Sequence, residues 1–239
     1  MKHTTPQHET ESTFTQTLAL ASVKSESHSL SRGLDMSENL TSLVADALFR
    51  SGCLKFGSFR IKSGALSPYY IDLAGLLSHP RELHRIAEGT AGKVREIAAG
   101  DRVDRLASIE LRGALLLPSV AVAADLPCVV VRKEAKAYGI TGRIVGEVAK
   151  GERILFFDDV VSEGLSKLEG IRPLEEAGAL VKDVLVVVDR EQDGKRNLEN
   201  LGYQVHALAK VSELVDSLHK AGNVTREQAD AVTNYIKKS

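Results

Sequence analysis

Two adjacent acids, Asp158 and Asp159, stand at the end of an apolar run, and a short loop with Ser162 and Gly164 follows them. Residues 154–166 read ILFFDDVVSEGLS and predict a strand, a loop and the start of a helix. The N–H groups at a helix start attract anions, and glycine lets a phosphate approach the backbone. The acids suit ribose hydroxyls or the water shell of a magnesium ion. The segment predicts a ribose-phosphate site, with solvated acids beside a helix N-cap as the alternative.

Three cations, Arg132, Lys133 and Lys136, follow a second apolar run in the segment VVVRKEAKAYG. The lysines flank a short polar stretch that leads to two glycines, a composition typical of a loop that closes over a site and excludes water. Cations in such a loop stabilise negative charge that develops on a leaving group. A charged, exposed turn is the alternative interpretation.

Arg190 follows a third apolar run, VLVVVD. Its guanidinium can bind a planar acceptor through two parallel hydrogen bonds. An internal ion pair with Asp189 or Glu191 is the alternative. On the first interpretation, Arg190 adds a binding position for a planar, negatively charged ligand.

The elements that must position these residues alternate between strands and helices. A hairpin-like pair of strands is predicted over residues 55–64 and 67–75. Further strands are predicted over residues 105–110, 127–134, 152–159, 181–191 and 203–211. Helices are predicted over residues 38–51, 80–99, 113–125 and 166–177, and two more helices follow the last strand. Buried strands that alternate with helices indicate a parallel sheet covered on both faces. Ligands bind such sheets at the carboxyl ends of the strands. The sequence places Glu110, Arg132, Lys133, Asp158, Asp159, Asp189 and Arg190 there.

Composition limits the class of protein. The chain has 239 residues, enough for one or two domains, and its 43% hydrophobic and 26% charged residues are typical of a globular protein. A net charge of −1 argues against a nucleic-acid partner. Cys53 and Cys128 show no metal-ligand spacing and are expected to be reduced thiols in a cytoplasmic protein. No apolar run reaches the roughly 20 residues of a membrane span.

Residues 1–36 differ from the rest of the chain because they are rich in Ser and Thr and lack an aliphatic pattern. Such a segment cannot bury enough apolar surface to offset its ordering entropy. We predict a disordered N-terminal tail over 1–36, with Met36 as a possible alternative start, and one folded domain over 37–239.

Four segments together resemble the orotate phosphoribosyltransferases, members of the type I phosphoribosyltransferase family. They are KFGSFRIKSGALSPYYID (55–72), VVVRKEAKAYG (129–139), the acid-pair segment 154–166, and VLVVVDREQDGKRNLENLGYQVHAL (184–208). The resemblance runs from about Glu38 to the C-terminus. It implies a type I phosphoribosyltransferase fold, an α/β fold whose central parallel sheet is flanked by helices and carries a small N-terminal hood.

The resemblance also implies an activity. Such an enzyme transfers the 5-phosphoribosyl group from phosphoribosyl diphosphate to orotate, giving orotidine 5′-monophosphate and diphosphate in pyrimidine synthesis. Magnesium is the implied cofactor, held mainly through substrate and water rather than by direct protein ligands. A cytoplasmic homodimer is implied as well, with no membrane and no nucleic acid as partner.

The family's site residues transfer to matching positions. The implied catalytic residues are Lys62, Lys133, Lys136, Asp158 and Asp159. The implied ligands of phosphoribosyl diphosphate are Arg112, Arg132, Lys133, Lys136, Tyr138, Asp158, Asp159, Val160, Val161, Ser162, Glu163, Gly164, Leu165 and Ser166. The implied ligands of orotate are Lys62, Tyr70, Ile71, Ser162 and Arg190.

The sequence departs from the family pattern at three places. Glu163 and Leu165 stand where the phosphate loop usually has small or hydroxyl residues, and a carboxylate near a phosphate is repulsive. Arg112 stands in a segment where bacterial relatives commonly carry lysine. Tyr138 replaces a frequent histidine and cannot become a cation near neutral pH.

These departures leave two other functions open. One is a catalytically weak nucleotide sensor or regulator that keeps the fold, although the retained cations favour an enzyme. The other is a phosphoribosyltransferase for another base, such as a purine, which Arg190 and the KSG segment disfavour by resemblance.

Overall fold

A computed structural model describes residues 36–61, 64–136 and 142–237 of the chain, and these residues belong to one compact unit. The predicted tail lies outside the described residues except for Met36, which is the first residue of helix α1 (Met36–Arg50). Lys62 and Tyr138 also lie outside them, as does the side chain of Lys136.

In the described part of the chain, the central sheet has six strands in the order β5-β4-β3-β6-β7-β8. The parallel strands are β3 (Arg105–Ile109), β4 (Cys128–Lys136), β6 (Arg153–Val161), β7 (Leu180–Asp189) and β8 (Gln204–Lys210). The interiors of β3, β6 and β7 are mainly apolar and almost completely buried, as expected for strands covered on both faces. The predicted parallel sheet is therefore confirmed, and its carboxyl ends share one edge.

Strand β5 (Gly142–Val145) is an exception, because it pairs antiparallel with β4 at the edge of the sheet. The sequence analysis predicts no strand over these residues, so β5 is an addition to the predicted parallel sheet. The connection from Lys136 to Gly142 is too short for the crossover that a parallel neighbour requires.

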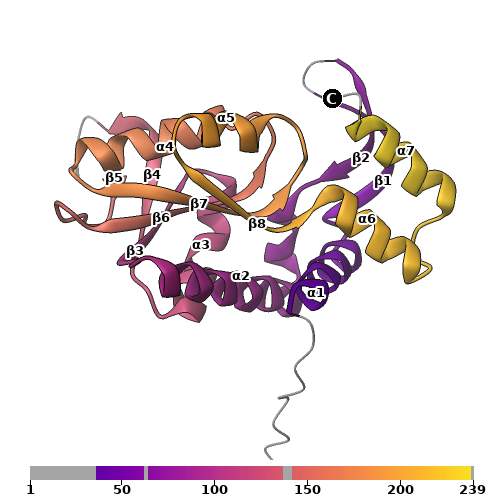
Figure 1. Ribbon diagram of the computed structural model, residues 1–239, viewed down its shortest axis with the longest axis horizontal. Coiled ribbons are helices and arrows are strands. Elements are labelled where there is room, and N and C mark those ends of the chain that lie inside the picture. Colours follow the sequence, from indigo (N-terminus) through magenta and orange to yellow (C-terminus); the bar gives the residue numbers. More distant parts are fainter. Residues whose placement is uncertain (1–35, 62–63, 137–141, 238–239) are drawn as a thin grey trace, which may run out of the picture. The chain divides into compact units, whose positions relative to one another are not determined.

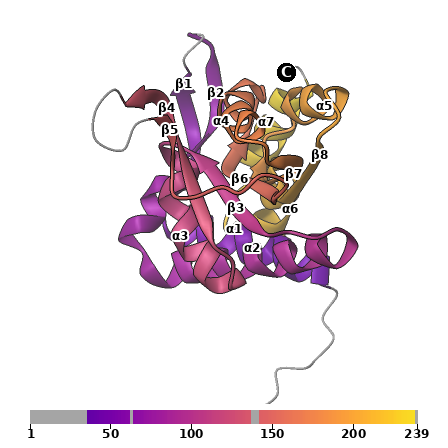
Figure 2. The ribbon, with the colours of Figure 1, turned by 90° about the vertical axis from the view of Figure 1, so that its left-hand side faces the viewer.

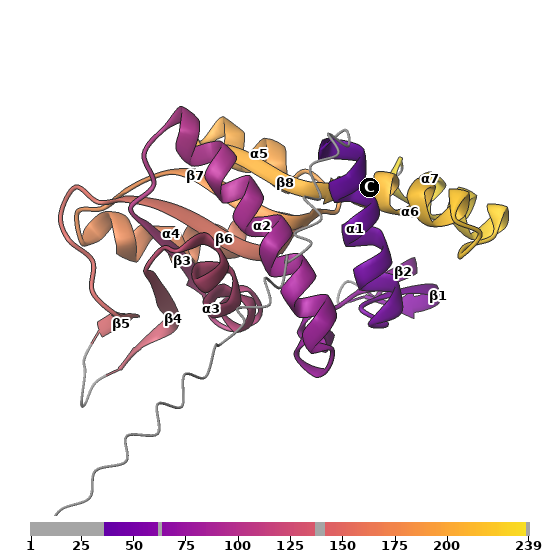
Figure 3. The ribbon, with the colours of Figure 1, turned by 90° about the horizontal axis from the view of Figure 1, so that it is seen from below.

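Helices cover both faces of the sheet. Helices α4 (Leu165–Glu176) and α5 (Gly194–Asn200) lie on one face, and α2 (Pro80–Gly100) and α3 (Arg112–Ala124) lie on the other (Figures 1 and 3). Residues of β6 alternate between the two hydrophobic clusters, with Phe157 in one and Phe156 in the other. This alternation also sends the side chains of Asp158 and Asp159 to opposite faces.

A small hood stands beside the end of the sheet near β8 (Figures 1 and 2). It consists of the antiparallel pair β1 (Leu54–Arg60) and β2 (Leu66–Ile71), the 3₁₀ segment η1 (Leu73–Ser78), α1, and the C-terminal helices α6 (Val211–Lys220) and α7 (Arg226–Ile236). The expected hood and hairpin are confirmed, and a capping box of Thr225 and Gln228 starts α7.

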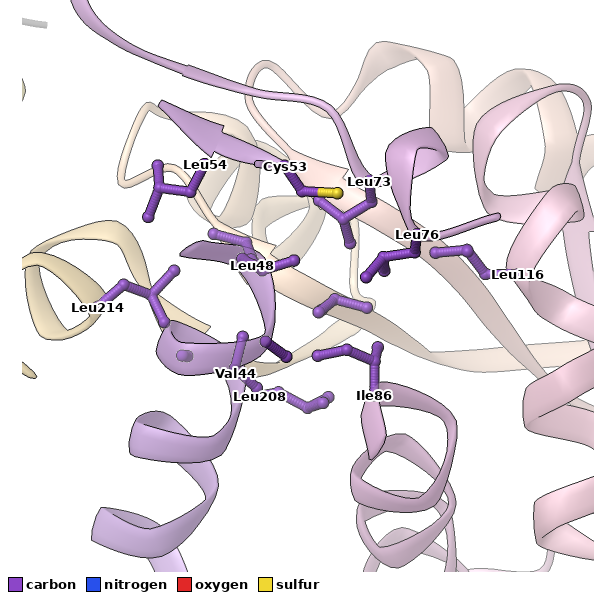
Figure 4. Packing of buried hydrophobic residues seen from close by; sticks show 14 of the residues in the cluster. Val44, Leu48, Cys53, Leu54, Leu73, Leu76, Ile86, Leu116, Leu208 and Leu214 are labelled. Atoms are coloured by element: carbon purple, nitrogen blue, oxygen red, sulfur yellow. The ribbon is translucent and has the colours of Figure 1, made fainter. Parts of the chain in front are cut away.

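The larger hydrophobic core joins the hood to the sheet. Val44 and Leu48 of α1 pack with Ile86 of α2, Leu116 of α3 and Leu208 of β8 (Figure 4). Burial of each such side chain contributes roughly 1.5–3 kcal/mol. The hood is therefore fixed to the sheet by shared apolar packing. Across the described ranges, no helix combines the length and apolarity needed to span a membrane.

Candidate active site

The acid pair lies at the carboxyl end of β6, as the sequence predicts. Asp158 and Asp159 are 5% and 4% exposed. Asp158 Oδ1 accepts a hydrogen bond from the N–H of Asp159 at 2.9 Å, and Asp159 Oδ1 accepts one from the N–H of Val160 at 2.8 Å. Both carboxylates are thus oriented by the strand end before any ligand binds, because the backbone fixes one oxygen of each.

A buried lysine, Lys167, pairs with this acid pair from the first turn of α4. Its Nζ lies 2.6 Å from Asp158 Oδ2 and also donates to the carbonyl of Val160 at 2.6 Å. Burial alone raises the pKa of a carboxyl group, and the pKa of Asp159 is raised to about 7 by burial first and by the neighbouring charge of Asp158 second. Lys167 acts on Asp159 in the opposite direction.

The predicted phosphate loop runs from the end of β6 to the start of α4, and the strand-loop-helix prediction is confirmed. Gly164 is the N-cap of α4 with φ of 85°, a backbone conformation that favours glycine. The N–H of Gly194 donates to the carbonyl of Ser162 at 2.8 Å, so the start of α5 supports the loop from behind. A Cβ on Gly194 would lie 2.9 Å from the Gly164 nitrogen.

The side chains of Glu163, Leu165 and Ser166 are exposed at this loop, whereas Val161 is buried and Val160 and Ser162 are partly buried. Leu165 is 64% exposed although it is the first residue of α4. The carbonyl of Glu163 accepts a hydrogen bond from Asn197 Nδ2 at 3.3 Å. The loop backbone is therefore anchored, while the side chains of Glu163 and Leu165, which depart from the family pattern, are exposed.

Arg190 connects the phosphate loop to the hood. Its Nη1 donates to Ser162 Oγ at 3.4 Å, and its Nε donates to the Tyr69 hydroxyl at 3.3 Å. Its guanidinium carbon also lies 5.2 Å from the centroid of the Tyr69 ring. These contacts differ from the internal pair with Asp189 or Glu191 that the sequence left open.

Tyr69 itself is completely buried, and burial raises the pKa of its hydroxyl. Its ring meets Tyr235 of α7 edge-on, with the centroids 6.0 Å apart. The neighbouring side chain, Tyr70, is 42% exposed and packs near Phe59, and Ile71 is partly buried. The hood thus supplies an aromatic support for Arg190 and an exposed ring beside it in β2.

The carboxyl ends of β3 and β4 are linked to each other. Glu110 Oε1 accepts a hydrogen bond from the N–H of Lys133 at 2.6 Å, and the Lys133 side chain is exposed. Arg132 is partly buried, and its buried Nη1 has no hydrogen-bond partner among the described residues. Buried donors are almost always satisfied, so this nitrogen is suited to an oxygen of a bound ligand.

Arg112 begins α3 and forms a close ion pair with Asp72, the N-cap of η1. The next residue, Gly113, lies against Asp158 and Ser108. The structure therefore brings α3, η1 and β6 together at the same edge. Of the residues predicted for the site, Lys62 and Tyr138 lie outside the described residues, and Lys136 is described only as the last residue of β4.

Sequence reasoning missed Lys167, Tyr69, Gly113 and Gly194. A signal for Lys167 was present, because the buried positions of α4 include Lys167, Gly170, Ile171 and Leu174, which have helical spacing. A lysine on the apolar face of a helix requires a buried partner, and the acid pair at the end of the preceding strand offers one. The other three are recognised only by contacts between distant segments.

Two hollows on the described surface lie away from the acid pair. One of about 360 Å³ lies between the hairpin and α7, beside Pro68 and Asn234. Another of about 590 Å³ lies near Asp101 and Arg153, at the opposite edge of the sheet. We place the candidate site by its chemistry, because hollow size alone carries no information about the reacting groups. Among the described residues, no three His, Cys, Asp or Glu side chains converge as a metal site.

Comparisons with known proteins point to one family. The orotate phosphoribosyltransferase of Pyrococcus abyssi is 35% identical over 182 residues, which cover 76% of this chain and 97% of that protein. That of Cenarchaeum symbiosum is 40% identical over 176 residues, covering 73% of this chain and 88% of the relative. No family model matches the chain.

Solved structures agree with these relatives. The UMP synthase of Leishmania donovani superposes with a TM-score of 0.75 at 32% identity, covering 84% of this chain but only 43% of that longer protein. The orotate phosphoribosyltransferase of Aeropyrum pernix superposes with a TM-score of 0.63 at 27% identity, covering 75% of this chain and 98% of its own. The fold expected from the sequence is thereby confirmed.

Proposed function

The chain belongs to the orotate phosphoribosyltransferase family, and we propose on that premise that it transfers the 5-phosphoribosyl group of phosphoribosyl diphosphate to orotate. The products are orotidine 5′-monophosphate and diphosphate, so the reaction belongs to pyrimidine synthesis. The observation that carries the proposal is the contact between Arg190 and Ser162, which joins a base-binding guanidinium to the phosphate loop. With orotate on Arg190 and the 5′-phosphate on the loop, the two substrates would lie side by side near the end of β6.

The proposed roles follow from the chemistry of each group. Asp159 accepts hydrogen bonds from ribose hydroxyls, and the loop from Ser162 to Ser166 holds the 5′-phosphate at the start of α4. Arg190 binds orotate through its planar guanidinium. Preorganised donors of this kind require little rearrangement during the reaction, so they stabilise the transition state efficiently.

Charge on the departing diphosphate needs cations at the ends of β3 and β4. As the bond from the ribose carbon to the diphosphate oxygen breaks, the electron pair leaves with the diphosphate. The orotate nitrogen forms the new bond and releases its proton to the diphosphate or to water. We assign this role to Lys133 and Arg132, and the buried Nη1 of Arg132 supports the assignment because it has no acceptor among the described residues. By resemblance to the family, we assign the same role of binding the departing diphosphate to Lys62, Lys136 and Tyr138.

Magnesium fits this donor set in a limited way. Both oxygens of Asp158 already have protein partners, which leaves Asp159 as the acid able to contact the water shell of the ion. Asp159 would hold magnesium together with substrate oxygens, and the ion would neutralise charge on the diphosphate. We further propose that the protein acts as a cytoplasmic homodimer.

An absorbance assay tests the proposed activity. We expect purified protein to consume orotate when phosphoribosyl diphosphate and magnesium are both present, and loss of orotate absorbance measures the reaction. Omission of phosphoribosyl diphosphate is the control. Stable binding of phosphoribosyl diphosphate by calorimetry, without orotate consumption, would instead identify the protein as the nucleotide sensor.

Substitution of Glu163 tests the phosphate loop. We expect Glu163→Thr to tighten binding of phosphoribosyl diphosphate by a few-fold. The substitution removes a carboxylate from the loop that holds the phosphate dianion, and this relieves a repulsion of order 1 kcal/mol in water. Isothermal titration calorimetry measures the change. Glu134→Thr, an exposed acid on β4, is the control for general charge. Equal affinities of Glu163→Thr and the unchanged protein would mean that the Glu163 side chain points away from the phosphate.

A further inference from the structure

Lys167 is an unusual residue for the position that it occupies. It is 4% exposed, and its side chain lies beneath the loop that connects β6 to α4. A buried ammonium is costly unless it is paired and its three N–H groups have acceptors. The acceptors are Asp158 Oδ2 and the Val160 carbonyl, each at 2.6 Å, and Ser166 Oγ at 3.4 Å.

The helix dipole adds a second cost to this position. Lys167 is the third residue of α4, and a cation near a helix N-terminus opposes the dipole. Its location is therefore favourable only because of the close contact with Asp158. A lysine that is kept in such a place has its function in these contacts rather than in solubility.

The three contacts tie together the two ends of the loop. Asp158 and Val160 lie before the loop, and Ser166 lies after it, within the first turn of α4. The ammonium of Lys167 thus connects the end of β6 to the start of α4 beneath the loop. It also occupies Asp158 Oδ2, while the N–H of Asp159 occupies Oδ1, so Asp158 has a protein partner at each oxygen.

We infer that Lys167 is a positioning residue for the phosphoribosyl group, holding Asp158 and both ends of the phosphate loop in the geometry that receives the ribose and its 5′-phosphate. The inference rests on the proposed function. Because Lys167 binds Asp158, the two acids have different roles: Asp158 supports the loop, and Asp159 faces the sugar. Its charge also offsets the negative charge of Asp158, its partner beside the phosphate loop.

Two substitutions separate charge from packing. Lys167→Met keeps the aliphatic stem and removes the ammonium, and Lys167→Gln keeps a hydrogen-bond donor without charge. We expect Lys167→Met to raise the KM for phosphoribosyl diphosphate by at least about tenfold, as loss of a buried charged contact predicts, while the KM for orotate stays within about twofold. Lys167→Gln is expected to lie between Lys167→Met and the unchanged protein.

Lys182→Met is the matched control. Lys182 also pairs with an aspartate, with its Nζ 3.3 Å from Asp101 Oδ2, but it is exposed and lies at the opposite edge of the sheet. This variant should keep both KM values. If Lys167→Met does not fold, as judged by its thermal transition, Lys167→Gln carries the comparison.

The outcomes distinguish this inference from the proposed function. Turnover with an unchanged KM for phosphoribosyl diphosphate in the Lys167 variants, or an equal rise in both KM values, overturns the inference alone. Binding of phosphoribosyl diphosphate without orotate turnover overturns the proposed function alone, and calorimetric affinities of the same variants then replace the KM values. A selective loss of affinity for phosphoribosyl diphosphate supports the positioning role.

Discussion

Gly113→Ala is expected to lower the turnover number of the proposed reaction by about 100-fold, the loss that a displacement of about 1 Å in a reacting group can cause. A Cβ at this position would overlap Asp158 Oδ1 and Ser108 Oγ and would lie 2.9 Å from the Asp158 Cα. Lys167 holds the other oxygen of Asp158, so the carboxylate cannot turn aside without breaking that ion pair. The end of β6 must shift instead, and the phosphate loop shifts with it.

Stability should change less than activity in this variant. Overpacking of this kind typically costs about 1–3 kcal/mol, which a folded domain of this size tolerates. Gly92→Ala is the matched control, because Gly92 is also a helical glycine but has no atom within 4 Å of an added Cβ. The control should gain up to about 1 kcal/mol from helix propensity. Steady-state kinetics and thermal unfolding of both variants measure the contrast, and equal activity would contradict the proposed importance of Asp158.

Lys133→Ala is expected to lower the turnover number by an order of magnitude or more. Stabilisation of transition-state charge by one preorganised group is typically worth about 3 kcal/mol. The Lys133 backbone is fixed at the end of β4 by its hydrogen bond to Glu110, and its exposed side chain is available for the diphosphate. The fold should be unaffected because the side chain is exposed.

A control lysine separates this role from overall charge. Lys150 is exposed and precedes β6, at the edge of the sheet opposite the acid pair. Lys150→Ala should therefore keep the turnover number. If Lys133→Ala retained full turnover under saturating substrates, Lys133 would have no part in stabilising the departing diphosphate.

Local patterns made most of the fold predictable. The runs that become β3, β6 and β7 are buried on both faces, and their continuous apolar sequence identifies them as parallel strands. The acid pair followed by a glycine-containing loop was recognised for the same reason, since strand, loop and helix are consecutive in the chain. Strand β5 was missed because it has four residues, one of them arginine, and helix α5 because it has seven and buries few side chains.

The support of the site could not be predicted in the same way. Arg190 was predicted as a binding residue, but its partner Tyr69 is 121 residues away, and nothing local indicates the pairing. The α3 segment shows the same limit, because Gly113 matters only through its contact with Asp158 on a different element. The pairing of Lys167 with Asp158 could have been predicted from the sequence, because Lys167 lies on the apolar face of its helix and the two residues are only nine positions apart.

The phosphate side and the base side of the site are completed at different times during synthesis, because the base side depends on the contacts among Arg190, Tyr69 and Tyr235. The contacts of Lys167 with Val160 span seven residues, so the phosphate side can organise soon after α4 leaves the ribosome. The base side needs a strand from the hood, the end of β7 and a ring from the final helix. Chains emerge from the N-terminus at about 5–20 residues per second. The aromatic support of the Arg190 guanidinium therefore forms only after nearly the whole chain has been translated. The contacts of Lys167 can therefore form early in synthesis, whereas the support of the loop by Gly194 and the contacts of Arg190 form only later.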